Sequence, residues 1–600
     1  METWRDKILE QFVPQISRLS IVSDPDNLLT EEKTTVLLRK SGFDILEFAD
    51  SIEFRFAYES QYRSIWDKGL KTELVVIIHT HKTDLNFLPY DLLQSGKKFY
   101  FSILDIFPMF SPAILNLLDR PYLDLLYSFR DRFPKEKQGD RFTIDFLLKY
   151  IYKLDIDTVN DELDLVKALL HIHYGNLDIP DPFMERLEYL FNERKIACPP
   201  SIKLLLTNKE RFTAYLLEKH REMLNNSPEV RFFCNIDNDE EKINTLQKYI
   251  KNINTAGELN HNDWINIAWK HAHLASLVYS GGHKSQIEEY ELLHSKTNES
   301  FEEWLSLYYP GLRTIPPLAP VMVHHIPHFL AYQYRQNKKP IALIVIDGLA
   351  LDQWITLRDS LGLGTVQYIE KALFAWIPTL TSVSRQSIFS GKNPYEYADS
   401  IHTTEREEKL WSLFWENNDF IRQNVLYMKG IDSDEKITEL SDRIISNKTL
   451  TMGLVLNKID NIIHGMEMGM EGLHNQIKLY GKNGTLGKLI IDLLEKDFEI
   501  WISSDHGNIE CIGHGRPSEA SIAKSRGERV RVYKSRELLK SMMEKFPWSA
   551  YWRPIGLPDE YFPLISKGNN AFLPENTRAV SHGSISMQET VVPFIKVVRR

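Results

Sequence analysis

The spacing of apolar residues changes along the chain and divides it into three regions. Over residues 1–130, apolar runs such as 72–80 alternate with helix-like stretches such as 30–42, which predicts a small α/β domain. From 131 to 335 the apolar residues recur with the 3.6-residue period of helices, for example over 262–279. Because strand-like runs are few there, we expect a mostly helical middle domain.

Residues 336–600 show a different pattern, in which continuous apolar runs alternate with helical periodicity. The runs are IALIVIDG (341–348), LFAWI (373–377), NVLYM (424–428), TMGLVLN (451–457) and FEIWISSDHG (498–507). Continuous apolar runs are typical of parallel strands buried on both faces. This alternation predicts an α/β domain with a mainly parallel sheet covered by helices on both sides. Ligands bind such sheets beyond the carboxyl ends of the strands.

Composition narrows the class of protein. The net charge of −10 argues against nucleic-acid binding over the whole surface and leaves room for a local basic groove. The three cysteines form no C-x-x-C pair, which argues against disulfides and a cysteine zinc site and suits a reducing cytosol. No apolar stretch approaches the roughly 18 residues of a membrane span, and the first residues lack the apolar core of a signal peptide. We therefore expect a cytoplasmic protein with no membrane segment.

Polar side chains follow several of the predicted strands. Asp347 comes directly after the first strand, and Asp505 and His506 come after the last of the five. Asp460 and His464 follow the fourth strand with i,i+4 spacing, which places both on one face of a helix, as two ligands of one metal require. These residues indicate a ligand site at the carboxyl edge of the sheet.

A hydroxyl-rich stretch, WIPTLTSVSRQSIFSG (376–391), follows the second strand. Thr381 lies just past a proline, where the sequence can begin a helix. A hydroxyl at a helix start lies beside free N–H groups and the positive end of the helix dipole. That is a favourable place for an oxygen nucleophile that meets a phosphate.

With His582, which precedes a final apolar strand, three aspartates, three histidines and one threonine are expected at successive strand ends of one sheet. Three carboxylates in a partly dry cleft repel one another and raise one another's pKa. Two divalent cations would outweigh them by about one positive charge, which suits a phosphate anion and a threonine alkoxide. Aspartate and imidazole are ligands for zinc or manganese. The sequence therefore predicts a two-metal site for phosphate chemistry.

The ordered set resembles the two-metal sites of the alkaline phosphatase superfamily. Five segments resemble the PglZ domain of BREX bacteriophage-resistance systems: LIVIDGLALDQW, PTLTSVSRQSIFSG, NKIDNIIHG, SSDHGNIE and VSHGSISMQETVVPF. Two N-terminal segments resemble PglZ of the BREX type 3 kind: WRDKILEQFVPQISRLSIVSDPD and FRFAYESQYRSIWDKG. The catalytic resemblance covers about residues 340–600 and implies an alkaline phosphatase-like fold there.

The resemblance also implies a role for each residue. Thr381 matches the nucleophile, which forms a phospho-threonine intermediate that is then hydrolysed. The ligands of one metal would be Asp347, Thr381, Asp505 and His506, and those of the other Asp460, His464 and His582. Zinc is the expected metal, with manganese as the alternative. Other BREX proteins are the expected partners.

Several alternatives stay open or are excluded. Thr379 is a competing nucleophile, and Arg385 either holds a phosphate oxygen or lies at the surface. The four-residue spacing between Thr381 and Arg385 resembles that of sulfatases, but sulfatases need Cys or Ser at the first position, where this chain has Thr381. Cofactor-independent phosphoglycerate mutases share SSDHGNIE but use a serine in a G-N-S-E context that is absent here. His514 matches no ligand position.

The sequence says less about the leaving group. The segment 524–540 holds seven Lys or Arg residues and two Glu, and it either leads a nucleotide backbone towards the metals or forms a solvated helix and edge strand. We expect a phosphodiesterase acting on nucleotides or nucleic acid. A phosphomonoesterase and a non-catalytic scaffold of the defence complex are the alternatives.

Overall fold

The computed structural model forms two compact units, residues 1–238 and 239–600. The residues it describes are 3–13, 18–48, 54–55, 58–67, 69, 73–78, 88, 90–118, 120–174, 179–193, 205, 209–219, 238–253, 259–281, 284–313, 320–446, 448–465, 469–517 and 527–599. The division at 238 falls inside the region expected to form a helical middle domain. Helices of that region after 238 thus belong to the same compact unit as the large sheet, and the three-domain division stays a prediction.

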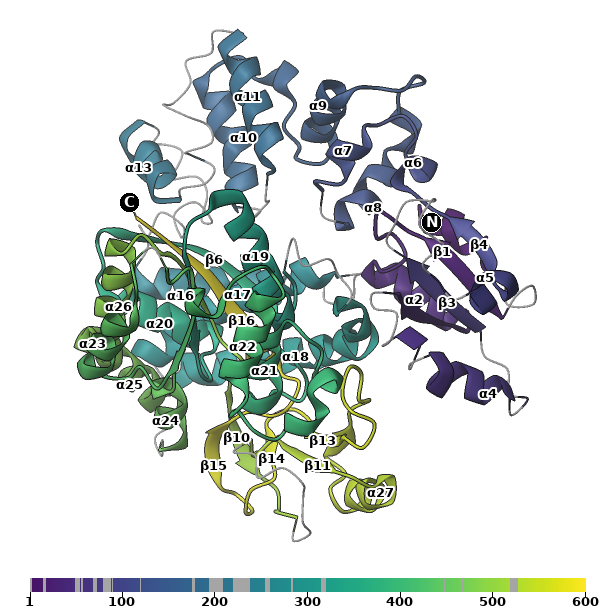
Figure 1. Ribbon diagram of the computed structural model, residues 1–600. Coiled ribbons are helices and arrows are strands. Elements are labelled where there is room, and N and C mark those ends of the chain that lie inside the picture. The colour runs from purple at the N-terminus through teal and green to yellow at the C-terminus, as the bar shows by residue number, and fades with distance from the viewer. Residues whose placement is uncertain are drawn as a thin grey trace. The chain divides into compact units, whose positions relative to one another are not determined.

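The first unit contains the predicted small α/β fold (Figure 1). Its sheet is parallel, with strands in the order β2-β3-β1-β4. The strands are β1 Leu19–Ser23, β2 Phe43–Glu47, β3 Glu73–Ile78 and β4 Lys97–Tyr100. Helix α2 (Glu32–Lys40) connects β1 to β2, and its N-cap Glu31 accepts a hydrogen bond from the N–H of Thr34.

The acidic loop after β1 has a structural role. The carboxylate of Asp24 accepts hydrogen bonds from the N–H groups of Leu28 and Leu29, and Asp26 accepts one from the N–H of Ile103. The other described α-helices of this unit are α1 Asp6–Leu9, α4 Ser64–Asp67, α5 Tyr90–Ser95, α6 Ile103–Ile106, α7 Pro112–Leu115, α8 Pro121–Ser128, α9 Asp140–Tyr150, α10 Glu162–Tyr174, α11 Asp181–Glu193 and α13 Lys209–Lys219. Those from α9 onwards lie in the region where the sequence predicts mostly helix.

The second unit is built on a six-stranded sheet in the order β6-β16-β9-β5-β8-β7. Only β16 runs antiparallel to its neighbours, so the prediction of a mainly parallel sheet is confirmed. The strands are β5 Ile341–Ile346, β6 Val366–Phe374, β7 Val425–Lys429, β8 Thr451–Leu456, β9 Glu499–Ser503 and β16 Val591–Arg599. Every residue of β5 and β8 is buried, which explains their uninterrupted apolar runs.

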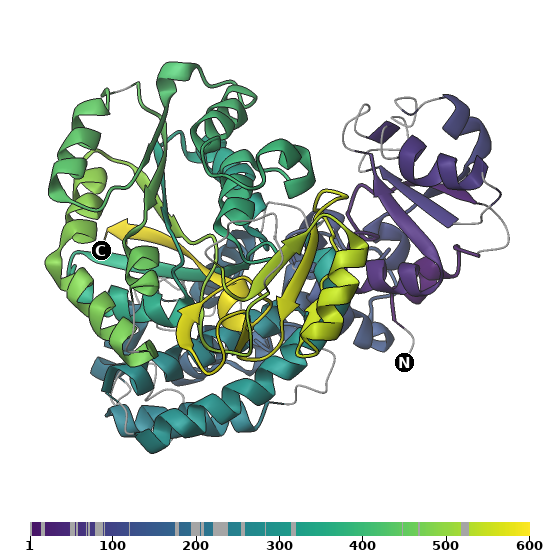
Figure 2. The ribbon, with the colours of Figure 1, turned by 90° about the horizontal axis from the view of Figure 1, so that it is seen from below.

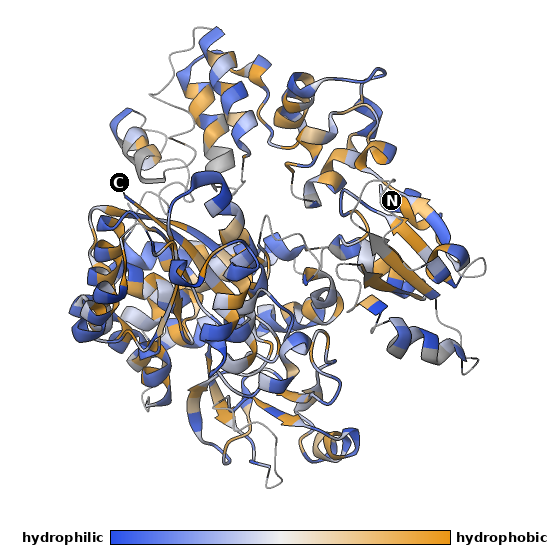
Figure 3. Ribbon diagram, in the orientation of Figure 1, coloured by the Kyte–Doolittle hydropathy of each residue, from blue (hydrophilic) through white to orange (hydrophobic). Residues whose placement is uncertain are grey.

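Helices cover both faces of this sheet (Figures 1 and 2). Helix α20 packs against α25, and α21 packs against α22. The helices are α16 Asp239–Lys251, α17 His261–Gly281, α18 Lys284–Leu312, α19 Ile326–Asn337, α20 Leu351–Leu361, α21 Thr381–Ser390, α22 Glu407–Glu416, α23 Asp434–Arg443, α24 Lys458–His464, α25 Gly469–Asn483, α26 Thr485–Glu495, α27 Arg536–Lys545 and α28 Met587–Thr590. In Figure 3 the strands are largely apolar, whereas the helices carry polar outer positions. Among the described helices, none has the length and apolar character needed to cross a bilayer.

Two small three-stranded sheets lie between β9 and β16 in the chain, on the side from which Figure 2 is viewed. Their orders are β14-β10-β15 and β11-β13-β12. The strands are β10 Ile509–Gly513, β11 Val530–Tyr533, β12 Ser549–Tyr551, β13 Phe562–Ser566, β14 Asn570–Ala571 and β15 Arg578–Ser581. His582 directly follows β15. The expectation that all seven site residues lie at strand ends of one sheet was therefore wrong for His582, because the sequence does not show which strands pair.

Candidate metal centre

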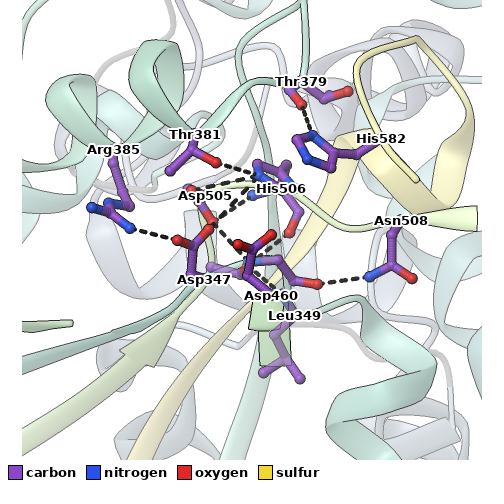
Figure 4. A network of polar contacts seen from close by, with 12 residues as sticks. Asp347, Leu349, Thr379, Thr381, Arg385, Asp460, Asp505, His506, Asn508 and His582 are labelled. Atoms are coloured by element: carbon purple, nitrogen blue, oxygen red, sulfur yellow. Dashed lines mark hydrogen bonds and ion pairs between the residues drawn. The ribbon is translucent and has the colours of Figure 1, made fainter. Parts of the chain in front are cut away.

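Asp347 and Asp505 are brought together by the parallel pairing of β5 and β9 (Figure 4). Asp347 directly follows β5, and the chain then turns at Gly348, whose φ of +73° favours glycine. The N–H of Gly348 donates to Oδ1 of Asp505 over 3.1 Å. This bond from backbone to side chain joins the ends of the two strands and holds the Asp505 carboxylate next to Asp347.

Each of these carboxylates has one oxygen engaged and one free. Oδ2 of Asp347 accepts a hydrogen bond from Nη1 of Arg385 at 2.6 Å, and Oδ1 of Asp505 accepts from the N–H groups of Gly348 and His506. The other oxygens, Asp347 Oδ1 and Asp505 Oδ2, are buried and have no hydrogen-bond partner among the described residues. Unpaired buried carboxylate oxygens are costly, which indicates that a cation belongs between them.

His506 is held in the tautomer that binds a metal. Its Nδ1 donates to the carbonyl of Gly507 over 3.0 Å, so Nε2 of the neutral ring carries a free electron pair. The Thr381 hydroxyl lies 3.0 Å from this Nε2 and donates to it. Residue 507 has to be glycine, because a Cβ there would lie 1.9 Å from the carbonyl oxygen of Gln588.

Asp460, His464 and His582 form a second group beside the first. Asp460 and His464 lie one turn apart on α24, with 3.1 Å between Oδ1 of the aspartate and Nε2 of the histidine. His582 Nδ1 donates to the carbonyl of Thr379 over 2.7 Å, which leaves its buried Nε2 without a partner. The rings of His582 and His506 stack with centroids 3.8 Å apart, so the two groups are adjacent.

The geometry therefore sorts six of the seven expected residues into two sets. In each set, one ligand atom per residue lies within 4.8 Å of the others: Asp347, Asp505 and His506 in one, and Asp460, His464 and His582 in the other. Thr381 adjoins the first set through His506. The unpaired atoms of Asp347, Asp505 and His582 and the imidazole and carboxylate donors fit divalent metals such as zinc. The assignment of these residues as ligands remains a prediction.

The charges of the site are unfavourable without cations. Burial and the neighbouring Asp505 raise the pKa of Asp347 well above its usual range, and burial raises the pKa of Asp505 to about 6. Burial and the adjacent His506 lower the pKa of His582 well below its usual value. Asp460 differs: burial raises its pKa, but the hydrogen bond to His464 and the charges of the neighbouring histidines together outweigh burial and lower the pKa to about 2. Cations would relieve the repulsion between the carboxylates.

The structure separates the two candidate nucleophiles. Thr379 is fully buried, its hydroxyl donates to the carbonyl of Ser584, and it accepts from the N–H of Gly583. Thr381 is partly exposed and is the first residue of α21, whose N-cap Leu380 makes no side-chain cap. The first N–H groups of a helix have no intrahelical acceptor, so those at Thr381 are available to an anion.

Arg385 lies inside the domain, and the surface location considered from the sequence was wrong. Its side chain is buried at 3% exposure. Nε and Nη2 donate to the two carboxylate oxygens of Glu407 over 2.8 and 2.9 Å, and Nη1 donates to Asp347. Sequence reasoning missed Glu407, because it is one of several acids in TEREEKLW and nothing there marks it as buried.

Parts of the basic segment 524–540 have structural roles. Arg529 is buried, pairs with Glu589 at 3.0 Å and donates to the carbonyls of Gly568 and Asn570. It is not available to a nucleotide backbone. Residues 524–526 lie outside the described residues. His514 is exposed, packs near Trp548 and belongs to neither ligand set.

The second unit has an alkaline phosphatase-like fold. Over residues 328–597 the chain matches the model of the BREX system PglZ alkaline phosphatase-like domain, and this part of the chain is therefore similar to that family. The match supports a phosphoesterase-type hydrolase.

Solved structures were also found to be similar. Murine ectonucleotide pyrophosphatase/phosphodiesterase 5 matches with 10% identity and a TM-score of 0.33, over 43% of this chain and 88% of that one. The human enzyme of the same name matches with 13% identity and a TM-score of 0.33, over 43% of this chain and 87% of that one. Phosphonoacetate hydrolase from Sinorhizobium meliloti 1021 in complex with phosphonoformate matches with 14% identity and a TM-score of 0.26, over 43% of this chain and 89% of that one. Among curated proteins, none matches the chain.

Proposed function

We propose that the protein is a two-metal phosphodiesterase of a BREX defence system that acts on nucleotides or nucleic acid, with Thr381 as the nucleophile. The observation that carries the proposal is the position of the Thr381 hydroxyl. It lies at an uncapped helix start, 3.0 Å from Nε2 of His506 and beside the two sets of acidic and imidazole groups. Within these sets, Asp347 Oδ1, Asp505 Oδ2 and His582 Nε2 are buried without a hydrogen-bond partner among the described residues. This arrangement supports attack by an activated hydroxyl on a bound phosphate.

The residues divide the work between binding and reaction. The two sets would hold two divalent cations, zinc being the best fit, which lower the pKa of a hydroxyl and stabilise charge on phosphate oxygens. The N–H groups at the start of α21 orient a phosphate oxygen. Thr381 Oγ1 attacks phosphorus, one alcohol leaves with the proton, and a phospho-threonine diester forms. Water then attacks the phosphorus and releases the monoester and the threonine hydroxyl.

The ion pairs of Arg385 favour a phosphate diester over a monoester as the substrate. A monoester carries one more negative charge, for which an additional cation is needed. Among the described residues, Arg385 is the arginine or lysine that bonds a carboxylate of the two sets, and Asp347 and Glu407 already engage it. Its charge is therefore compensated within the protein, which favours a substrate with a single negative charge on its phosphate.

We expect metal-loaded protein to hydrolyse bis-p-nitrophenyl phosphate faster than p-nitrophenyl phosphate, because the charge of Arg385 is already compensated and does not offset the second negative charge of a monoester. The measurement is kcat/KM for both esters on one preparation, with zinc and then manganese. Faster turnover of the monoester would contradict the diester assignment. Bound metal without turnover of either ester would favour the scaffold role.

We expect Asp347→Ala and His582→Ala each to lower metal content by about one equivalent, because each residue belongs to a different set. Metal is measured by elemental analysis after gel filtration, beside protein concentration. His514→Ala is the matched control, since this histidine is exposed and outside both sets. Full metal content in both variants would refute the ligand assignment.

A further inference from the structure

Three buried side chains form a clamp behind Asp347, and none of them belongs to either ligand set. Arg385 on α21 bonds Asp347, Glu407 at the start of α22 bonds Arg385, and Tyr427 on β7 bonds Glu407. We call Arg385, Glu407 and Tyr427 the Asp347 clamp. It joins two helices on one face of the sheet to a strand and to the end of β5.

Glu407 is the centre of the clamp. Its side chain is completely buried and accepts three hydrogen bonds: two from Arg385, at 2.8 and 2.9 Å, and one from the Tyr427 hydroxyl at 2.6 Å. A two-point pair between a guanidinium and a carboxylate fixes the plane of the guanidinium. The orientation of Arg385, and hence of its third bond, depends on Glu407.

That third bond determines which oxygen of Asp347 faces the site. Arg385 holds Oδ2 at 2.6 Å, and Oδ1 is left buried, unpaired and 3.8 Å from Nε2 of His506. Glu407 also compensates the positive charge of Arg385. Without that compensation the guanidinium would repel a cation beside Asp347 and compete with it for the carboxylate.

We propose that Glu407 is a positioning residue for the metal held by Asp347, Asp505 and His506, acting through Arg385, and that Tyr427 supports it. This inference rests on the proposed two-metal site. It assigns Arg385 to the orientation of Asp347 and not to the binding of phosphate. The clamp bonds Asp347 alone among the ligands, whereas His582 of the other set is oriented by the carbonyl of Thr379. A defect in the clamp therefore weakens one metal and spares the other.

The test is a two-site zinc titration of the full-length protein against a chromophoric chelator. We expect Glu407→Gln to weaken one of the two zinc equivalents by about 10- to 100-fold and to change the other by less than about threefold. Tyr427→Phe keeps the charge of Glu407 and removes one hydrogen bond, so it should weaken the same equivalent by about two- to fivefold. This variant keeps the test decisive if Glu407→Gln does not fold.

Glu370→Gln is the matched control, because it breaks another Arg–Glu pair of the same unit, with Arg358 at 2.8 Å, away from both ligand sets. It should leave both affinities unchanged. Unchanged zinc affinity in folded Glu407→Gln and Tyr427→Phe would overturn the clamp, as would equal weakening of both equivalents. Wild-type protein that binds no metal would overturn the proposed function itself, so the two failures are distinguishable.

Discussion

Thr381→Ala is expected to lower the rate of diester hydrolysis by at least about a thousandfold while leaving the fold and most of the bound metal in place. The alanine removes the only oxygen that the proposed reaction transfers phosphate to. The metal should remain, because three other residues of the first set keep their ligand atoms within 4.8 Å of one another. The measurements are kcat/KM with bis-p-nitrophenyl phosphate, metal content, and the melting temperature.

Two serine variants show which of the two threonine hydroxyls is the nucleophile. Thr381→Ser keeps a hydroxyl at the helix start and should retain measurable turnover, with the p-nitrophenyl phosphoryl group of the substrate trapped on residue 381 after acid quench. Thr379→Ser keeps the hydrogen bonds to Ser584 and Gly583 and should be close to wild type. Phosphate recovered on residue 379, or full activity in Thr381→Ala, would show that the nucleophile is assigned wrongly.

The mainly parallel sheet of the second unit could be predicted, because strands buried on both faces appear in the sequence as continuous apolar runs. The runs at β5 and β8 match strands in which every residue is buried. The Asp460–His464 spacing was readable for the same reason: i,i+4 residues share a helix face whatever the rest of the fold does.

What the sequence could not show depends on pairing between distant segments. His582 reaches the site from β15 of a small sheet, and the partner of β15 is β10, which is not adjacent to it in the chain. The burial of Arg385 depends on Glu407, 22 residues later and on another helix. A charged residue is expected at the surface unless an oppositely charged partner is known, and the sequence does not show that Glu407 is the partner of Arg385.

Removing the metals is expected to destabilise the second unit strongly. A ligand present at a hundred times its dissociation constant stabilises the folded state by about 2.7 kcal/mol, so two metals would contribute about 5 kcal/mol. For a unit of this size we expect EDTA to lower the melting temperature by on the order of 5–10 °C. Calorimetry before and after chelation measures the shift, with zinc added back to restore it. An EDTA-insensitive melting curve would contradict the metal site.

Asp347→Asn is expected to change the melting temperature in opposite directions with and without zinc, which a general loss of stability would not do. The Asp347 carboxylate is buried beside Asp505, and both burial and this neighbour raise its pKa, so its charged form is unfavourable in the metal-free fold. Asparagine removes the charge and keeps an oxygen for Arg385, whose own charge remains paired with Glu407. In EDTA the variant should therefore melt at or above the wild-type temperature, whereas with zinc it should melt below it. A residue that only packs the core would lower the melting temperature under both conditions, so the crossing of the two curves is the signature of a carboxylate placed to hold a cation.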